Sequence, residues 1–123
     1  MCIRDSSYEI ALQTGDSGRV SGIDQNSEMI RYANKRCENL RNTEFSEAIA
    51  NDLPFPEESF DAACCTQVLL YVNDVAQVIS EIKRVLKPAG RIIIVETDWR
   101  GVVLNSYDNS ITCLLYTSDA ADE

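Results

Sequence analysis

An aspartate at the end of a short strand is the first residue of this chain whose type and position suggest chemistry. Residues 19–24, with the sequence Arg-Val-Ser-Gly-Ile-Asp, are predicted to form a strand that ends at Asp24. In open parallel sheets, ligands bind beyond the carboxyl ends of the strands, and an acid at the end of the second strand typically accepts hydrogen bonds from ribose hydroxyls. The alternative is that Asp24 caps the next helix, because Asp, Asn and Ser all favour N-cap positions.

The stretch from Phe60 to Asp98 is predicted to supply the scaffold for such a site. Residues 60–65 and 91–96 are short apolar runs typical of strands buried on both faces. Between them, Asn73 or Asp74 offers an N-cap, and a basic last turn is followed by a stop at Pro88 and Gly90. The apolar stripe of this helix consists of Val75, Val78, Ile79, Ile82, Val85 and Leu86. A right-handed crossover makes the two strands parallel, so the fold class is α/β with a doubly wound, mostly parallel sheet.

Three further elements are predicted before Phe60. Residues 7–14 form the tail of an amphipathic helix that ends at Gly15, and residues 43–48 form a half-polar strand suited to the edge of the sheet. Asn26 or Ser27 caps a second helix. Its inner face is expected to hold Met29, Ile30, Ala33, Cys37 and Leu40. The prolines in Leu53-Pro54-Phe55-Pro56 exclude regular structure there.

Composition narrows the class of protein. The chain has 123 residues, a net charge of -9, five cysteines and no histidine, which indicates one small acidic domain and argues against nucleic acid as a partner. No run is apolar enough to span a membrane and no signal peptide is evident, so we expect a cytoplasmic protein. Without histidine or a C-x-x-C pair, no metal site is expected.

Both ends of the chain look foreign to it. Residues 1–6 and 113–123 resemble the translation of transposon-end adapters used in sequencing libraries, one in each orientation. We therefore predict that residues 1–6 and 113–123 are adapter-derived and that residues 7–112 are a fragment of one domain.

Three ordered motifs give the chain a resemblance. They are Gly22-Ile23-Asp24 with Met29-Ile30, then Leu53-Pro54-Phe55-Pro56 with Ser59-Phe60-Asp61, and Val85-Leu86-Lys87-Pro88 with Gly90-Arg91. In these motifs the chain resembles the class I S-adenosylmethionine-dependent methyltransferases, in the type 11 branch similar to ubiquinone and menaquinone biosynthesis enzymes. The resemblance implies a Rossmann-like fold that is incomplete here. The family's first strand, with its glycine-rich loop, would lie between the strand ending at Asp24 and the strand beginning at Phe60, and the closing strands are absent too.

The resemblance also implies a set of cofactor-binding residues. Asp24 matches the acid that binds the ribose of S-adenosyl-L-methionine, and Gln25 and Met29 lie where side chains approach the adenosine. Ile49 and Ala50 match the adenine-binding position, although Ile49 replaces an acid and its side chain cannot accept a hydrogen bond. Adenine recognition would then rest on the backbone of Ala50, on apolar contact from Ile49, or on Asn51 or Asp52. Thr66 and Gln67 match the segment that faces the methionine moiety and the substrate, or else they begin a helix.

Methyl transfer to a small-molecule acceptor needs alignment more than a dedicated acid or base. If the acceptor loses a proton, the candidates are Glu96, Asp98 and Tyr71, each of which has an equally plausible structural role, and Trp99 could line an acceptor pocket. Without its first strand this fragment is expected to be inactive. Two alternatives remain: a nicotinamide-dependent oxidoreductase, which leaves the proline motif unexplained, and a methyltransferase-like domain that lost catalysis, as Ile49 suggests.

Overall fold

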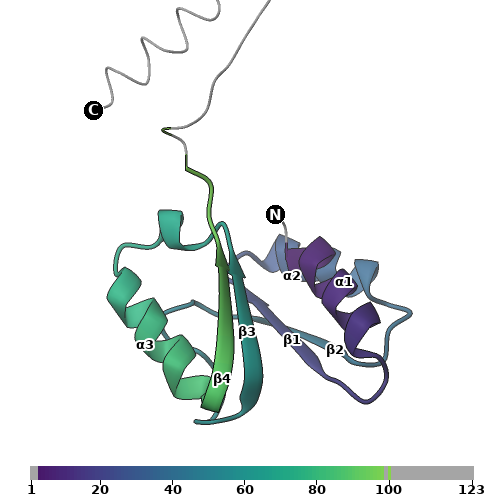
Figure 1. Cartoon of the computed structure of the whole chain (residues 1–123). Helices are drawn as coiled ribbons and strands as arrows, with labels where there is room; N and C mark the ends of the chain where they lie inside the picture. Colours follow the sequence, from purple (N-terminus) through teal and green to yellow (C-terminus); the bar gives the residue numbers. More distant parts are fainter. Residues whose placement is uncertain (1–2, 99, 101–123) are drawn as a thin grey trace, which may run out of the picture.

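The computed structural model describes residues 3–98 and 100, which form four strands and three α-helices (Figure 1). In chain order the elements are α1 (Ile3–Thr14), β1 (Val20–Asp24), α2 (Ser27–Arg36), β2 (Thr43–Glu47), β3 (Phe60–Thr66), a short 3-10 helix η1 (Leu69–Tyr71), α3 (Val75–Val85) and β4 (Leu86–Val95). Among these helices none is both long and apolar enough to cross a bilayer.

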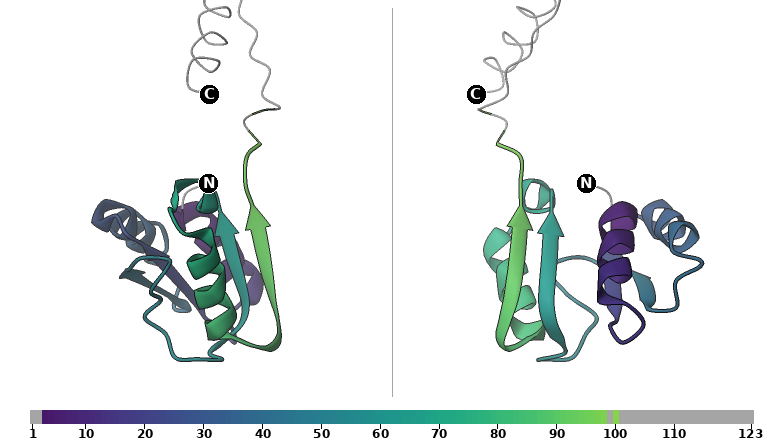
Figure 2. Two further views of the ribbon diagram at one scale, coloured as in Figure 1. Left: turned by 90° about the vertical axis from the view of Figure 1, so that its left-hand side faces the viewer. Right: turned by 45° about the vertical axis from the view of Figure 1, so that its right-hand side comes forward.

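The strands form two separate parallel pairs. β1 pairs with β2 in a register that runs from Val20 opposite Thr43 to Asp24 opposite Glu47, and β3 pairs with β4. The strands lie between α3 on one side and α1 and α2 on the other, which confirms the doubly wound α/β architecture (Figures 1 and 2). Within the described residues no strand joins β1 to β3, and the family resemblance places the absent first strand at this position.

Helix α3 has the cap that its sequence predicts, but only part of the predicted apolar stripe is buried: Val75 and Ile79 are exposed, and Leu86 belongs to β4. The Asp74 side chain caps α3 by accepting a hydrogen bond from the backbone N–H of Gln77 at 3.0 Å. Val78, Ile82 and Val85 recur at helical spacing and are buried. Removal of each such side chain from water stabilises the fold by about 1.5–3 kcal/mol. This burial holds α3 near β3 and β4.

The end of α3 differs from the prediction. The helix ends at Val85, so Lys87 and Pro88 lie in β4 and do not belong to the helix. The register shows why, because Phe60 faces Leu86 whereas Ala62 faces Arg91, and the extra residues form a bulge in which Ala89 has a φ of 64°. A Cβ on Gly90 would lie 2.8 Å from the carbonyl oxygen of Lys87, so only glycine fits there.

The expectation that β3 and β4 are buried on both faces is wrong for this chain. Cys65 is buried and Cys64 is exposed, as expected for side chains on opposite faces of one strand. Ile92, Ile93, Ile94 and Val95 are also exposed. The physical reason is that α3 covers one face of β4 only in part, and no described element covers the other face.

Helices α1 and α2 pack together beside β1 and β2. The Asn26 side chain caps α2 by accepting from the backbone N–H of Glu28 at 2.9 Å, and Cys37 is a core residue as predicted. Helix α1 ends at Gly15, whose φ of 67° suits glycine. It begins at Ile3, so it includes residues that were expected to be adapter-derived and is longer than residues 7–14.

Candidate functional site at the carboxyl ends of the strands

The structure brings Asp24 and the residues after β2 together. The backbone N–H of Ala48 donates to the carbonyl oxygen of Asp24 at 3.1 Å, which extends the ladder between β1 and β2 by one step. Residues 49 and 50 follow directly, so the predicted ribose-binding and adenine-binding positions are neighbours. In Figures 1 and 2, β1 and the arrowheads of β3 and β4 run toward the same side of the molecule.

The Asp24 carboxylate is oriented by its own backbone. Its Oδ1 accepts from the backbone N–H of Asn26 at 2.8 Å, and Asn26, not Asp24, is the N-cap of α2. No other described residue donates to Asp24, so Oδ2 keeps its acceptor capacity. The neighbouring candidates differ in exposure, since Gln25 is exposed and Met29 is half-buried.

Residues 49–52 form a turn after β2. The backbone N–H of Asp52 donates to the carbonyl oxygen of Ile49 at 3.2 Å, and the Gln77 side chain on α3 donates to the carbonyl oxygen of Asn51 at 3.3 Å. Ile49 is 47% exposed, whereas Ala50 is half-buried. An exposed isoleucine can offer a ligand apolar contact, and the polar groups at this position are those of Ala50, Asn51 and Asp52.

The segment that follows is bound by an ion pair on α3 that the sequence reasoning missed. Arg84 donates through Nε to Glu81 Oε1 at 2.8 Å and through Nη2 to Glu81 Oε2 at 2.9 Å. The same guanidinium donates to the carbonyl oxygens of Leu53, at 3.0 Å, and Phe55, at 2.8 Å. Glu81 Oε2 accepts from the backbone N–H of Leu53 at 2.8 Å. We call this arrangement the Glu81–Arg84 clamp.

The clamp strongly favours the ionised carboxylate. The hydrogen bonds from Arg84 and from the backbone of Leu53 lower the pKa of Glu81 to about 2. A signal for the clamp does exist in the sequence, because prolines 54 and 56 prevent the segment from pairing its own backbone groups. An i,i+3 Glu and Arg on the neighbouring helix are suitable partners, but this spacing more often marks an exposed surface pair.

Polar contacts also join the ends of β3 and β4. Gln67 has a φ of 55°, its backbone N–H donates to the carbonyl oxygen of Val95 at 2.8 Å, and its side chain donates to the Thr97 hydroxyl. A left-handed backbone is uncommon for a residue other than glycine. Thr66 is the last residue of β3 and is half-buried, so both predicted residues lie at this end of the strand pair.

The structure assigns a contact to Glu96, one of the three candidate bases. Glu96 Oε1 accepts from the backbone N–H groups of Val68 and Leu69 at 3.1 and 2.8 Å, which caps η1, whereas its buried Oε2 has no partner among the described residues. Asp98 is exposed and accepts from the backbone N–H of Arg100, and Tyr71 is 74% exposed. Trp99 lies outside the described residues. Burial, with Glu96 and Cys64 nearby, raises the pKa of the Cys65 thiol, which opposes a nucleophilic role.

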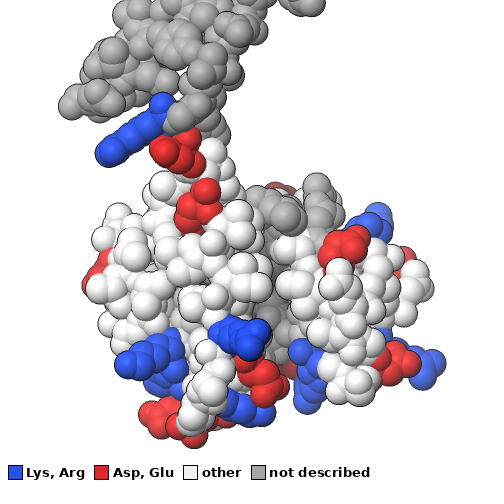
Figure 3. Space-filling view, in the orientation of Figure 1, with Lys and Arg blue, Asp and Glu red and all other residues white. Residues whose placement is uncertain are grey.

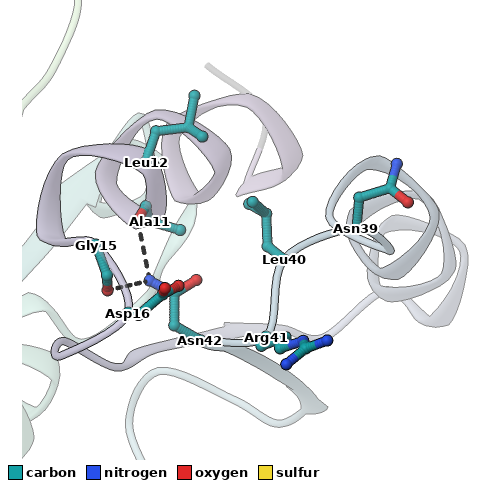
Figure 4. Close-up of a pocket in the computed structure, with 8 residues that line it drawn as sticks. All are labelled: Ala11, Leu12, Gly15, Asp16, Asn39, Leu40, Arg41 and Asn42. Carbon is teal, nitrogen blue, oxygen red and sulfur yellow. Dashed lines mark hydrogen bonds between the residues drawn. The ribbon is translucent and has the colours of Figure 1, made fainter.

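A pocket of about 250 Å³ lies at the opposite end of the strands. Its lining comes from residues just before β1 and just before β2, with the end of α1 (Figure 4). Asn42 Nδ2 donates there to the carbonyl oxygens of Ala11 and Gly15, both at 2.9 Å. Because Asn42 already satisfies the end of α1, we assign this pocket a structural role.

Charges on the face in Figure 3 are mixed. Acidic and basic side chains of the described residues are interspersed over this face. The described part of this face therefore gives no support for a nucleic-acid-binding surface, which would need clustered basic side chains.

Comparison with known families decides what this strand arrangement is. The family model described as "Methyltransferase domain" matches residues 4–94, about three quarters of the chain. The chain belongs to this family. It is a class I S-adenosylmethionine-dependent methyltransferase domain of the type 11 branch, and S-adenosylmethionine is the cofactor that goes with that family. The match favours this family over the nicotinamide-dependent oxidoreductase that the sequence left open.

Individual relatives agree with the family and show how much of it is present. A demethylmenaquinone methyltransferase of Lactobacillus johnsonii is 40% identical over 96 residues, which cover 76% of this chain and 39% of that protein. Geranyl diphosphate C-methyltransferase from Streptomyces coelicolor, solved with S-adenosyl-L-homocysteine, has a TM-score of 0.69 at 23% identity and covers 94% of this chain and 43% of that one.

A third relative catalyses a different reaction. The [4+2]-cyclase SpnF has a TM-score of 0.65 at 28% identity over 72% of this chain and 34% of that chain. In all the curated relatives that we compared, the chain spans less than half of their length.

The residues at the carboxyl ends of the strands fit S-adenosylmethionine in part. Asp24 presents a carboxylate oxygen with no described donor, as a diol-binding acid requires. The exposed Ile49 side chain has apolar atoms only and cannot accept a hydrogen bond from an amino group.

Proposed function

We propose that this domain binds S-adenosylmethionine and transfers its methyl group to a small-molecule acceptor. The observation that carries the proposal is the contact between Asp24 and Ala48, because it places an oriented carboxylate beside the turn at residues 49–52. A carboxylate that can bind a ribose lies next to a turn that can contact a nucleobase, both at the carboxyl ends of parallel strands. This arrangement suits a nucleoside ligand.

We assign the cofactor-binding roles as follows. Asp24 accepts hydrogen bonds from the ribose hydroxyls, while Gln25 and Met29 approach the adenosine from the start of α2. Ile49 and Ala50 contact the adenine, and Thr66 and Gln67 face the methionine moiety and the acceptor from the end of β3. These roles follow the family motifs, and the contacts at both strand ends support them.

The bound cofactor supplies an electrophilic methyl group, so the protein's task is alignment and exclusion of water. The hydrogen bonds from Gln67 to Thr97 and from the start of η1 to Glu96 hold the carboxyl ends of β3 and β4 in place relative to each other. Glu96 Oε2 is a buried oxygen with no described hydrogen-bond partner, so it is the atom we assign to take up a proton that the methyl-accepting substrate loses. We give residues 1–6 and 113–123 no role in the function.

We propose that the chain as it stands is inactive and binds the cofactor very weakly. Within the described residues no strand bridges β1 and β3, so the part of the site at Asp24 and the part at Thr66 are not fixed by one continuous sheet. Calorimetric titration of this chain with S-adenosyl-L-homocysteine should therefore show no binding in the micromolar range, and micromolar binding would overturn this proposal.

The test of the function uses a form of the protein extended to the length of its curated relatives. We expect that form to bind S-adenosyl-L-homocysteine, and Asp24→Ala to weaken binding by about 10- to 100-fold, because hydrogen bonds to a charged group are lost. Asp16→Ala is the matched control, since Asp16 lines the pocket at the opposite end of the strands. A flat titration of the extended wild type would contradict the proposal.

A second candidate is a domain that binds a ligand at the same place without methyl transfer. It is motivated by Ile49 in place of an acid and by the similarity to a cyclase. Single-turnover assays with radiolabelled S-adenosylmethionine and a panel of quinol and phenol acceptors separate the two. Cofactor binding without methylated product from any acceptor would favour this second candidate.

A further inference from the structure

The segment between β2 and β3 connects the two strand pairs and is fixed at both ends. At its start, the backbone of Ala48 is bonded to Asp24 on β1. At its end, the backbone N–H groups of Glu58 and Ser59 donate to the carbonyl oxygens of Arg84 and Val85 on α3, at 2.9 and 2.8 Å. The turn at residues 49–52 lies between these anchors, so its position depends on how the segment is attached to α3.

The Glu81–Arg84 clamp makes the central attachment. It bonds both backbone groups of Leu53 and the carbonyl oxygen of Phe55, next to the two prolines that prevent regular pairing. The two side chains are only 30% and 13% exposed, for Arg84 and Glu81. A half-buried, bidentate pair that bonds the backbone constrains that backbone much more than a solvated pair would.

We infer that Glu81 and Arg84 are positioning residues for nucleoside recognition, acting through the backbone of Leu53 to hold residues 50–52 beside Asp24. The inference rests on the proposed function, because it needs a nucleoside at Asp24. Among the described residues, neither side chain is hydrogen-bonded to a predicted cofactor-binding residue. Their effect passes through Leu53, which directly follows the turn, and through Gln77 of the same helix, which bonds Asn51.

Helix α2 offers a matched control pair. Glu28 and Arg31 have the same residue types at the same i,i+3 spacing, with a 3.5 Å contact and exposures of 63% and 75%. Within the described part of the chain, their side chains bond no backbone group outside their own helix. Glu81→Gln and Arg84→Lys are therefore compared with Glu28→Gln and Arg31→Lys, changes that keep side-chain size or charge.

The first measurement is amide hydrogen exchange on the chain as it stands. We expect Glu81→Gln and Arg84→Lys to speed exchange at Asp52 and Leu53 by about tenfold, since a charged partner of the backbone is lost or loosened. Exchange in the middle of β4 should not change, and the α2 control variants should leave residues 52 and 53 as in the wild type. Equal acceleration across the molecule would overturn the inference, because it would show a purely global loss of stability.

The second measurement tests recognition in the extended form. Wild type should bind S-adenosyl-L-homocysteine more tightly than S-inosyl-L-homocysteine, which lacks the adenine amino group, by about tenfold. In Glu81→Gln and Arg84→Lys this ratio should fall toward one, a change that lower stability alone would not produce.

The outcomes separate the inference from the function. Binding of S-adenosyl-L-homocysteine with a preference for adenine that is unchanged in both clamp variants, or that is absent in the wild type, overturns the inference and leaves the proposed function standing. No binding by the extended wild type overturns both.

Discussion

Two helices of this domain carry the same Glu-x-x-Arg spacing with different results. On α2, Glu28 and Arg31 meet in solvent at 3.5 Å. On α3, Glu81 and Arg84 meet at 2.8 Å, are largely buried, and bond the backbone of the segment between β2 and β3. Exposed pairs of the first kind contribute about 0–1 kcal/mol.

The difference comes from what lies beside each helix. Among the described residues beside α2, the Glu28 and Arg31 side chains bond no backbone group, so the pair stays a surface pair. Alongside α3 lies a segment with two prolines, whose carbonyl and N–H groups need partners from elsewhere. The same local sequence therefore becomes a tertiary contact only where irregular backbone is near.

A substitution on the buried face of α3 should cause the largest loss of stability. Val78 is 1% exposed, so Val78→Asp places a carboxylate among apolar side chains and should cost about 3–5 kcal/mol, as an unpaired buried charge does. Ile79→Asp on the same helix, at 36% exposure, should cost much less. Urea unfolding followed by circular dichroism measures both, and equal losses would show that α3 is not anchored through Val78.

The stability that the Glu81–Arg84 clamp contributes should depend on pH in the acid range. Glu81 has a folded pKa of about 2, below the unfolded value of about 4.3, so the stability that it contributes is complete above about pH 4.3 and is lost as the pH falls toward 2. Glu81→Gln should flatten the dependence of unfolding free energy on pH in this window. Urea unfolding between pH 2 and 5 is the measurement, and parallel curves for wild type and Glu81→Gln would contradict the clamp.

Removal of the side chains that cap α1 and α2 should lower the free energy of unfolding by smaller amounts. Asn42→Ala removes two side-chain to backbone hydrogen bonds at the end of α1 and should cost about 1–2 kcal/mol. Asn26→Ala removes one N-cap bond on α2 and should cost about 1 kcal/mol. Thermal melting ranks the two variants, and a reversed order would mean that Asn42 contributes little to the end of α1.

The smallest expected effect is a difference in reactivity between the adjacent cysteines on β3. Cys64 is exposed, whereas Cys65 is buried and the pKa of its thiol is raised. Alkylation with iodoacetamide at pH 8, followed by peptide mass spectrometry, should therefore modify Cys64 before Cys65, because the thiolate is the reactive form. Modification of Cys65 before Cys64 would contradict this orientation of β3, because it would show that the Cys65 side chain is the more accessible one.

Sequence reasoning worked where periodicity or a cap fixes the local structure. Asp74 and the stripe at Val78, Ile82 and Val85 predict α3, and Cys37 was correctly expected in the core. It fails at the end of α3: Pro88 predicts a later helix stop, whereas the helix ends at Val85, the chain turns into β4 at Leu86, and a bulge forms before Arg91.

Other failures concern contacts between distant segments. No periodicity links Arg84 to Leu53, since the two lie far apart in the sequence and meet only when α3 packs beside the proline segment. The exposure of Ile93 depends on what covers the second face of β4, which the strand's own composition cannot show. Asp24 is a candidate from its position at a predicted strand end and from the family motifs, and Thr66 is a candidate from the family resemblance alone. The residues that contact them are known only from the fold.

The exposure of β4 on both faces has a consequence for handling the protein. Ile92, Ile93, Ile94 and Val95 are consecutive, β-branched and uncharged, with exposures between 38% and 59%. Such segments readily stack with copies of themselves into fibrillar aggregates, and repulsion from a net charge of -9 opposes this. The shelf life of concentrated solutions should therefore shorten with added salt and near the isoelectric point of about 4.4.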